Sequence, residues 1–385
     1  MSQTEPSMIE GSWSSFLFGT ISVFVWRSVQ LISGVGIVAL AGLYLKQDSL
    51  LYFPEIGGMP RNPAHNPRGY RSPADHKFLF EDLRIICEDG ISIHAWLILG
   101  GNNNNNNVVS NDHTKDHTNN PTDIPTIIYF HANAGNLGLR LPNAVQMLRR
   151  LNVNILMVEY RGYGRSDRVA PNESGLRLDG RAALKFAQTH PKIDPTNIFL
   201  FGRSLGGAVA FATARYAQDN SNRRGANNIQ PLKGVVVENT FTSIPDMVDE
   251  LMPLVSKFKN LILAIGWHSL DIVPTLTCPV LYLAGSRDEI VPHSQMLKLH
   301  QSTTASVLNQ LHVIHRGTHN ESWAQGGEIY WDAIKSFLAG AISVANNSDN
   351  INVNVNNGRI HHPPVGSSYN TVSDMGDDDA GKKEL

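Results

Sequence analysis

The sequence is poor in cysteine and carries no excess of charge of either sign. Its two cysteines, Cys87 and Cys278, are too few for a disulfide scaffold or a cysteine-rich zinc module. Lys and Arg number 32 against 34 Asp and Glu, a net charge of -2, which excludes a generally basic protein that coats nucleic acid. The chain has neither a GxxxxGKS/T phosphate loop nor an HExxH zinc helix. We therefore predict no metal, no organic cofactor and no nucleic-acid partner.

What the chain does have is length and apolar content. It has 385 residues, of which 42% are hydrophobic, and this is enough to form a sizeable core. It is too long for one ordinary small domain and a little long for one large α/β domain. Segments outside a single globular domain are therefore expected.

An uncharged stretch lies near the N-terminus. Residues 28–45 contain no charged side chain, and 18 residues is the lower limit for a helix that spans a membrane. A cleaved signal peptide would carry basic residues before the apolar run, but the first 26 residues hold none. A buried core helix is a further alternative, although Trp26 and Tyr44 bracket the stretch as interfacial aromatic residues do. We predict a single membrane anchor, with the lipid bilayer as partner, after an N-terminal segment 1–27.

The charges around this stretch bear on topology. Arg27 precedes it, whereas Lys46 and then Arg61 follow, which favours a cytosolic C-terminal side. Lys382 and Lys383 match a retrieval signal of the endoplasmic reticulum that is read in the cytosol, while the final Glu-Leu half-matches a lumenal one. An ordinary charged tail explains the same residues. We expect a single-pass protein of the endoplasmic reticulum or another endomembrane.

The remainder predicts one α/β domain over residues 50–342. Apolar runs on either side of Glu88-Asp89-Gly90 indicate a hairpin. The Asn-rich stretch 102–123 cannot bury a core face, and we interpret it as a surface-loop insertion. Residues 343–385 are rich in Asn, Gly, Pro and Asp and predict a disordered tail.

Short apolar runs then alternate with helical patterns, of which 175–190 and 205–218 are the clearest. The runs lack the strict alternation of a sheet with one exposed face, as expected when helices cover both faces. This βαβ rhythm predicts a mostly parallel, doubly wound sheet. The predicted strands are 125–130, 153–160, 197–202, 234–238, 279–285 and 310–315.

One pentapeptide in this domain carries chemistry. Residues 202–206 read Gly-Arg-Ser-Leu-Gly, a GxSxG motif that is weak evidence alone because a Gly-rich turn gives the same letters. A strand runs directly into it and an Ala-rich helix follows, which is the context of a nucleophile elbow. The flanking glycines permit a sharp turn that places Ser204 at the helix N-terminus, where the helix dipole favours negative charge.

A serine hydroxyl needs an adjacent base, and on the fold that carries such an elbow an acid and then a histidine follow in chain order. Asp288 comes just after strand 279–285 and is the favoured acid, with Glu238 as its rival and Asp271 and Glu289 as less favoured choices. His319 follows Gly317 in the loop after the last strand and is the predicted base. His312 and His315 fall within the strand run and are interpreted as surface or structural residues.

The predicted oxyanion hole comes from two loops. The strand 125–130 ends in His131-Ala132-Asn133-Ala134-Gly135-Asn136, where this fold places one backbone donor. Asn133, or its neighbour Ala132, would supply that N–H, and Leu205 would supply the other. His131 is expected to organise the loop through hydrogen bonds and not to titrate in catalysis.

Seven segments together resemble the membrane-anchored serine hydrolases of the α/β-hydrolase superfamily, the group that includes the fungal bud-emergence hydrolase and animal α/β-hydrolase domain-containing protein thirteen. They cover most of 50–340 and read LLYFPE (50–55), FHANAGN (130–136), EYRGYGRSD (159–167), GRSLGGAVA (202–210), ENTFTSI (238–244), GSRDEIVP (285–292) and GTHNESW (317–323). The chain departs from the pattern at Ala132, where relatives usually carry Gly, so its Cβ could narrow the approach to the oxyanion hole.

The resemblance implies an N-terminal anchor and Ser204, Asp288 and His319 as a catalytic triad. We therefore expect a membrane-anchored serine hydrolase that cleaves an acyl ester or thioester of a lipid or an acylated protein through an acyl-enzyme. The apolar stretch 245–275 is interpreted either as a cap over the site or as a helix packed on the sheet. The alternative function is a non-catalytic membrane scaffold of hydrolase fold in polarity or signalling.

Overall fold

The structure is a computed structural model that describes residues 10–101, 121–221 and 229–356. The chain forms two units, Met1–Val344 and Ala345–Leu385, and the sheet belongs to the first. Most of the expected Asn-rich insertion, 102–120, lies outside the described residues, as does the end of the expected tail, 357–385.

Eight strands form one sheet in the order β1-β2-β4-β3-β5-β6-β7-β8. The hairpin β1–β2 turns at the predicted Glu88-Asp89-Gly90, and β2 pairs with β4 in antiparallel register. All other pairs are parallel, which confirms the mostly parallel doubly wound α/β sheet. The strands are β1 Phe80–Ile86, β2 Ser92–Ile98, β3 Thr126–Phe130, β4 Asn154–Glu159, β5 Ile198–Arg203, β6 Gly234–Glu238, β7 Val280–Gly285 and β8 Asn309–Ile314.

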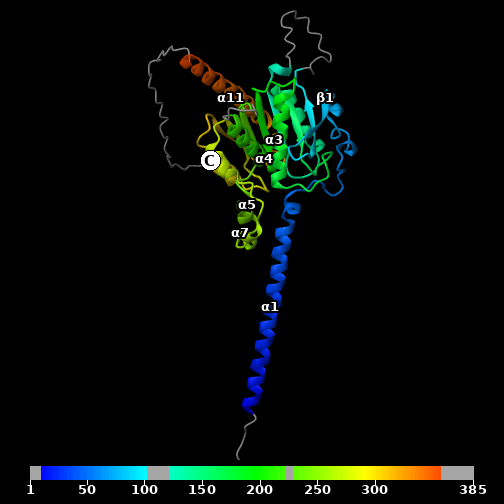
Figure 1. Ribbon diagram of the computed structural model, residues 1–385, viewed down its shortest axis with the longest axis vertical. Coiled ribbons are helices and arrows are strands. Elements are labelled where there is room, and N and C mark those ends of the chain that lie inside the picture. Colours follow the sequence, from blue (N-terminus) through cyan, green and yellow to red (C-terminus); the bar gives the residue numbers. More distant parts are fainter. Residues whose placement is uncertain (1–9, 102–120, 222–228, 357–385) are drawn as a thin grey trace, which may run out of the picture. The chain divides into compact units, whose positions relative to one another are not determined.

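Helices connect the strands and follow the predicted rhythm (Figure 1). The α-helices are α1 Glu10–Leu51, α2 Leu141–Leu151, α3 Glu173–Thr189, α4 Leu205–Ser221, α5 Ile244–Leu251, α6 Pro253–Ser256, α7 Lys259–Ile262, α8 Ser269–Ile272, α9 His293–Ser302, α10 Ser322–Gln325 and α11 Gly327–Asn356. Short 3-10 helices lie at Pro63–His65, Pro73–His76, Pro121–Asp123, Leu137–Arg140 and Val273–Thr275.

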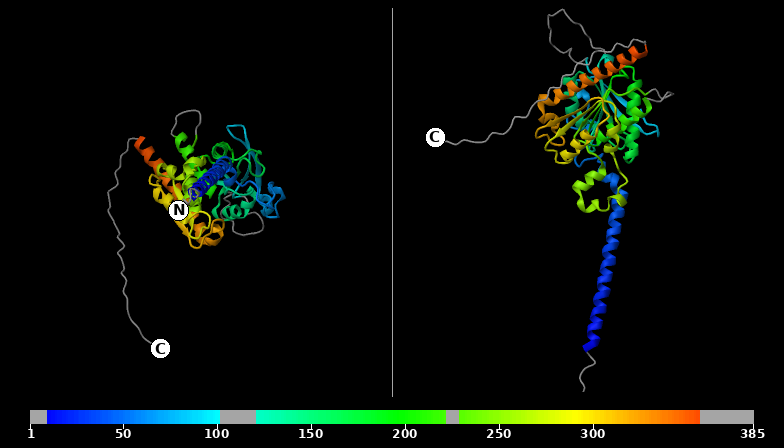
Figure 2. Two further views of the ribbon diagram at one scale, coloured as in Figure 1. Left: turned by 90° about the horizontal axis from the view of Figure 1, so that it is seen from below. Right: turned by 90° about the vertical axis from the view of Figure 1, so that its left-hand side faces the viewer.

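The hydrophobic core has one layer on each face of the sheet, whose strands lie side by side in the right-hand view of Figure 2. On one face, side chains of α3, α4 and α9 pack against alternate strand residues such as Phe130 and Val237. On the other face, α2 and the part of α11 around Phe337 cover residues such as Tyr129 and Phe201. Burial on both faces explains why the strands lack polar alternation.

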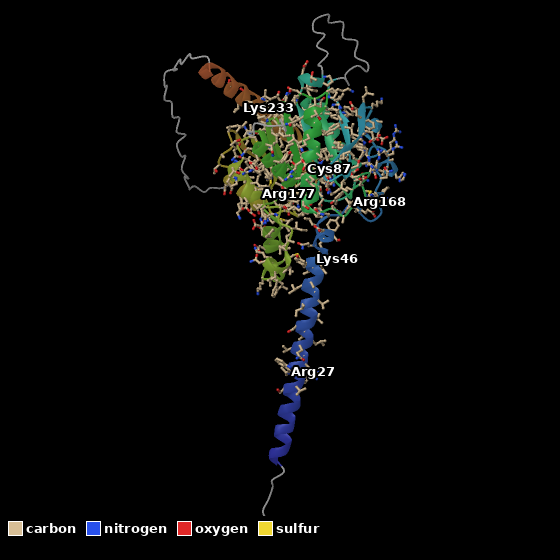
Figure 3. The ribbon with its side chains drawn as sticks, in the orientation of Figure 1. Arg27, Lys46, Cys87, Arg168, Arg177 and Lys233 are labelled. Atoms are coloured by element: carbon tan, nitrogen blue, oxygen red, sulfur yellow. The ribbon has the colours of Figure 1, made fainter. Side chains whose placement is uncertain are left out.

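The N-terminal helix is longer than the predicted anchor. α1 runs without a break from Glu10 to Leu51 and so includes most of the segment 1–27. Ser22–Leu51 is long and apolar enough to cross a membrane, and none of its most apolar window is buried against the protein. Figure 3 labels Arg27 and Lys46, the two basic residues of α1, which flank the uncharged stretch 28–45.

The C-terminal helix also exceeds its expected end. We expected the ordered chain to stop near residue 342, but α11 continues to Asn356. Its first part is fixed by buried side chains such as Tyr330 and Phe337. Helix propagation adds one backbone hydrogen bond per residue to such a nucleus, so a polar sequence can extend it.

The segment 245–275 forms several short helices, α5 to α8. Ser243 caps α5, because its side chain accepts the N–H of Asp246, and Pro245 occupies the first turn. α5, α6 and α7 contain only one buried residue, Ile262, whereas α8 packs beside α4 and α9. α8, at the end of the segment, therefore joins the helical layer, and a cap formed by 245–275 stays a prediction.

Candidate active site

Ser204 stands at the sharp turn between β5 and α4. Its φ angle of 54° lies in the left-handed region that side-chain-bearing residues rarely adopt. The turn is possible because residues 202 and 206 are glycines and have no Cβ. A Cβ at Gly206 would lie 2.1 Å from the carbonyl oxygen of Phe130, and a Cβ at Gly202 would lie 2.1 Å from the carbonyl oxygen of Gly206. Two hydrogen bonds to the backbone of Ser204 stabilise this strained conformation. Its N–H donates to the Glu238 carbonyl, and its carbonyl accepts the hydroxyl of Thr240.

His319 and Asp288 meet as the sequence predicts. Nδ1 of His319 lies 2.8 Å and 3.0 Å from the two carboxylate oxygens of Asp288, and their side chains are only 4% and 2% exposed. The N–H groups of Ile290 and Val291 donate to Oδ1 of Asp288 and fix the carboxylate. With Nδ1 engaged by the acid, Nε2 is the nitrogen left to accept a proton.

Ser204 and His319 line the same pocket. Among the described residues, no hydrogen bond joins Ser204 Oγ to His319. In sites without substrate the bond between nucleophile and base is often long and tightens when the substrate binds. The three predicted residues are therefore brought to one site, with the His–Asp contact formed.

Two polar residues that sequence reasoning did not assign hold the His319 loop. Asn239 donates from Nδ2 to the carbonyls of Thr318 and His319 and accepts the Gly285 N–H. Glu289, considered only as an acid, accepts the His319 backbone N–H at 3.0 Å. Asn239 lies within the ENTFTSI segment, so the sequence marks it as part of a motif but does not indicate that it holds the His319 loop.

The rival acids face other partners. Glu238 is fully buried, accepts from Arg203 at 2.8 Å and from the Tyr330 hydroxyl at 2.9 Å, and so is engaged away from His319. Asp271 is exposed and lies near His268.

The two other candidate histidines are outside the pocket. His312 lies within β8, and His315 is exposed just past the end of this strand. Neither lines the pocket of Ser204.

The loop after β3 is held above the serine by backbone and side-chain bonds. Its Asn133 carbonyl accepts the Phe53 N–H and the Tyr163 hydroxyl, and Asn133 Nδ2 donates to the carbonyl of Leu51. Ala132 and Asn133 line the pocket, and within the described residues neither their N–H groups nor that of Leu205 has an acceptor. Ala132 has a negative φ, so its Cβ is accommodated without backbone strain.

His131 is completely buried beneath this loop. Its Nδ1 lies 2.6 Å from the Ala132 carbonyl, and its ring packs on Tyr160. Burial first, and then the nearby Arg140 guanidinium, lower the pKa of His131 to about 4. The imidazole is therefore neutral at physiological pH and organises the loop as expected.

The pocket has a volume of about 560 Å³ and is mainly apolar. Its far wall consists of residues from α5 to α7 and from the last turns of α1. Arg140 adds a guanidinium beside the loop after β3, where it donates to the Ala134 carbonyl and, among the described residues, forms no ion pair. No cluster of three or more metal-ligating side chains occurs in the part of the chain that the structure describes.

Several curated proteins are similar over almost their whole length. Protein bem46 of Schizosaccharomyces pombe is 32% identical over 338 residues, which are 86% of this chain and 96% of that protein. The α/β-hydrolase domain-containing protein WAV2 of Arabidopsis thaliana is 31% identical, over 80% of this chain and 93% of its own. An uncharacterised membrane protein of Saccharomyces cerevisiae, YNL320W, is 30% identical, over 82% and 98%.

Solved structures share the fold at much lower identity. An esterase of Pyrococcus furiosus superposes with a TM-score of 0.51 at 16% identity, covering 75% of this chain and 97% of that one. The Butyrivibrio proteoclasticus esterase Est1E with bound ferulic acid has a TM-score of 0.50 at 20% identity, over 68% and 99%. No family model matches the chain.

The candidate span in α1 and the similarity to a protein described as a membrane protein together indicate membrane association. The two esterase structures share the fold of this chain. The chain belongs to the α/β-hydrolase family that contains bem46 and WAV2.

Proposed function

We propose that this protein is a membrane-anchored serine hydrolase that cleaves an acyl ester or thioester with Ser204, His319 and Asp288. The observation that carries the proposal is the buried His319–Asp288 contact, which shares one pocket with a serine on a strained elbow. Strain of this kind persists where the surrounding structure enforces it, and it concentrates at functional sites.

In the proposed reaction, His319 Nε2 takes the proton of Ser204 Oγ as the oxygen attacks the substrate carbonyl carbon. The tetrahedral intermediate collapses, the bond to the alcohol or thiol breaks, and His319 returns the proton to that leaving group. A water molecule, deprotonated by His319, then attacks the acyl-enzyme, and His319 returns this proton to Ser204 Oγ as the bond to the acyl group breaks and the carboxylic acid is released. Asp288 holds the imidazole tautomer and stabilises the imidazolium.

The negative oxygen of the intermediate needs donors that are already in place. The N–H of Leu205 at the start of α4 and that of Asn133 or Ala132 are the candidates, because their hydrogen bonds are unused among the described residues. Each such donor typically contributes about 3 kcal/mol to lowering the barrier. The Arg140 charge beside the loop adds a favourable potential.

The apolar pocket supports an acyl chain as the occupant, because its long wall offers few polar partners. An acylated lipid or an acylated protein is the proposed substrate class. We further propose an endomembrane such as the endoplasmic reticulum as the location, from the anchor and the C-terminal dilysine.

The alternative is a non-catalytic membrane scaffold. A scaffold would not need a strained serine, a buried His–Asp contact and free backbone donors around one apolar pocket. These features therefore favour an enzyme.

The test is hydrolysis by the full-length chain in detergent, with esters of increasing acyl length. Ser204→Ala should lose about 10⁶-fold in kcat, down to background, with an unchanged melting temperature. Ser294→Ala, which alters an exposed serine on α9, is the matched control and should keep full activity. Hydrolysis that persists in folded Ser204→Ala protein would refute the proposed nucleophile.

A further inference from the structure

The mouth of the pocket is formed by residues that also belong to the protein surface. Leu251 and Met252 line the pocket and are 54% and 47% exposed, and Leu50 at the end of α1 lines it and is 58% exposed. The rim of the pocket is therefore apolar where the end of α1 faces the α5–α6 segment.

The apolar surface continues beyond the rim. The side chains of Leu251, Met252, Leu254, Phe258 and Leu261, here called the cap face, are all largely exposed within eleven residues. Leu254 and Leu261 are 80% and 76% exposed and do not line the pocket. An exposed patch of this kind marks a surface that contacts a partner or a membrane.

The segment carries charges of both signs, and Glu250 is exposed beside Leu251. Asp249 is paired with Lys259 and accepts the Ser256 hydroxyl. Lys257, next to Phe258 in the sequence, is exposed, and Lys46 on α1 is also exposed. Lysines beside an apolar face suit the level of anionic lipid headgroups.

The pocket reaches the end of the candidate membrane span. Leu43, within the uncharged stretch 28–45, lines the pocket together with Gln47 and Leu50. At a rise of about 1.5 Å per residue, Leu50 lies only about 7.5 Å beyond Leu45 along the helix axis. If 28–45 fills the hydrocarbon layer, the pocket mouth lies at the membrane–water interface.

The end of α1 is also bonded to the segment beyond α7 and to the loop after β3. Gln47 Oε1 accepts the backbone N–H groups of Ala264 and Ile265, just past α7. Asn133, a candidate oxyanion donor, binds the carbonyl of Leu51 through its side chain. The end of α1 is thus tied by direct hydrogen bonds to the segment that follows the cap face and to the loop after β3.

From these observations we propose that the cap face lies in the membrane interface beside α1 and that the substrate is a bilayer lipid with an acyl ester. The acyl chain enters the pocket between the end of α1 and α5–α6 without passing through water. This inference rests on the proposed function for its chemistry, whereas the membrane contact of the cap face stands without it.

The first experiment locates the cap face without any use of catalysis. Full-length Leu254→Cys protein is labelled with bimane and reconstituted into phosphatidylcholine–phosphatidylserine vesicles that contain doxyl-labelled lipids. Burial raises the pKa of both Cys87 and Cys278 to about 12, so the introduced thiol is the one that reacts. Leu79→Cys, at a residue 75% exposed before β1, is the matched control.

Doxyl lipids should quench the probe at position 254 several-fold more than the probe at position 79. Equal quenching at the two positions would overturn the membrane contact of the cap face. This result holds whether or not the protein proves to be a hydrolase.

The second experiment tests the entry route. In full-length Leu254→Asp/Leu261→Asp protein, hydrolysis of a long-chain monoacylglycerol embedded in vesicles should fall about 10-fold or more. Hydrolysis of water-soluble p-nitrophenyl acetate should stay unchanged, since neither residue lines the pocket. Leu79→Asp/Ile329→Asp, which changes a leucine and an isoleucine that are 75% and 69% exposed, should leave both rates unchanged.

Three outcomes would contradict the entry route. Unchanged turnover of the embedded ester in the double variant would refute it, as would an equal loss with both esters, because the substitutions would then impair the site itself and not the access of the lipid. If the double variant lost hydrolysis of an S-acylated peptide but kept hydrolysis of the embedded lipid, an acylated protein would be the substrate. Failure of the proposed function is separate: the wild type would then hydrolyse neither ester, while the quenching result would remain.

Discussion

At the scale of single residues, two carboxylates near the ends of neighbouring strands have different partners: Glu238 is the last residue of β6, and Asp288 follows the end of β7. Asp288 contacts His319, whereas Glu238 contacts Arg203 and Tyr330. Their positions in the sequence are similar, because each lies near the carboxyl end of an apolar strand. The contacts therefore distinguish a positioning acid from a structural one.

Replacement of each acid by its amide separates these roles. Asp288→Asn should lower kcat about 10⁴-fold with little change in melting temperature, because the imidazole would adopt the wrong tautomer. Glu238→Gln should cost about 3–5 kcal/mol of stability, because it leaves the buried Arg203 charge unpaired. Assayed at low temperature, the folded fraction of Glu238→Gln protein should still hydrolyse esters. Folded but inactive Glu238→Gln protein would instead make Glu238 the acid.

His131 gives a prediction of pH dependence. Its folded-state pKa of about 4 lies below the value of about 6.5 in an unfolded chain, so the unfolded state binds a proton first as pH falls. The stabilising contribution is complete above pH 6.5 and is lost between pH 6.5 and 4, by about 3 kcal/mol in total. Denaturant titrations of the wild type and His131→Asn should show that the variant lacks this part of the acid loss. Parallel pH profiles would contradict a neutral buried His131.

At the scale of elements, Asn239 joins three of them. It follows β6, donates to the carbonyls of Thr318 and His319 in the loop after β8, and accepts the N–H of Gly285 at the end of β7. Its φ of 49° is left-handed, a conformation that asparagine tolerates. The base is thus positioned by a residue about 80 positions away in the chain.

Asn239→Asp keeps the side-chain shape and the acceptor for Gly285 but sets a carboxylate against two carbonyls. The His319 loop should shift, and kcat should fall up to about 10²-fold with little change in KM. Asn309→Asp is the matched control, since Asn309 also donates to two carbonyls, those of His300 and Thr303. Equal kcat in the two folded variants would show that Asn239 has only a structural role.

The sequence predicts those elements whose signals are local. The strand before Ser204 and the helix after it are visible as an apolar run and an Ala-rich pattern, and GxSxG marks the turn between them. The order of Asp288 and His319 then follows the known order on this fold. The roles of Asn239 and Gln47 could not be predicted, because their partners lie about 80 and 217 residues away in the sequence.

Local sequence patterns also did not predict the lengths of α1 and α11. Composition placed the anchor at 28–45 and the ordered end near 342, but charge and polarity set no helix end there. Arg27 lies on an exposed helix side, and α11 extends from its packed first turns. Helix ends depend on caps and on packing, which composition does not report.

At the scale of the whole molecule, the account requires that α1 holds the protein in a membrane. Alkaline carbonate should leave the full-length chain in the membrane pellet. Val35→Arg/Val38→Arg should move it to the supernatant, because each central arginine costs about 3 kcal/mol in a lipid-exposed helix. The control Ser28→Arg alters the edge of the stretch beside Arg27 and should stay in the pellet. Extraction of the wild type would show that α1 does not span a bilayer.

The central claim is that Ser204 is an activated nucleophile, and covalent labelling tests it without knowledge of the substrate. The full-length protein should react with a fluorophosphonate probe, and mass spectrometry should find one adduct, on the peptide that contains Ser204. Folded Ser204→Ala protein should give no adduct, and Asp288→Asn should react much more slowly. A folded wild-type protein that does not react, or an adduct that persists in Ser204→Ala, would contradict the account.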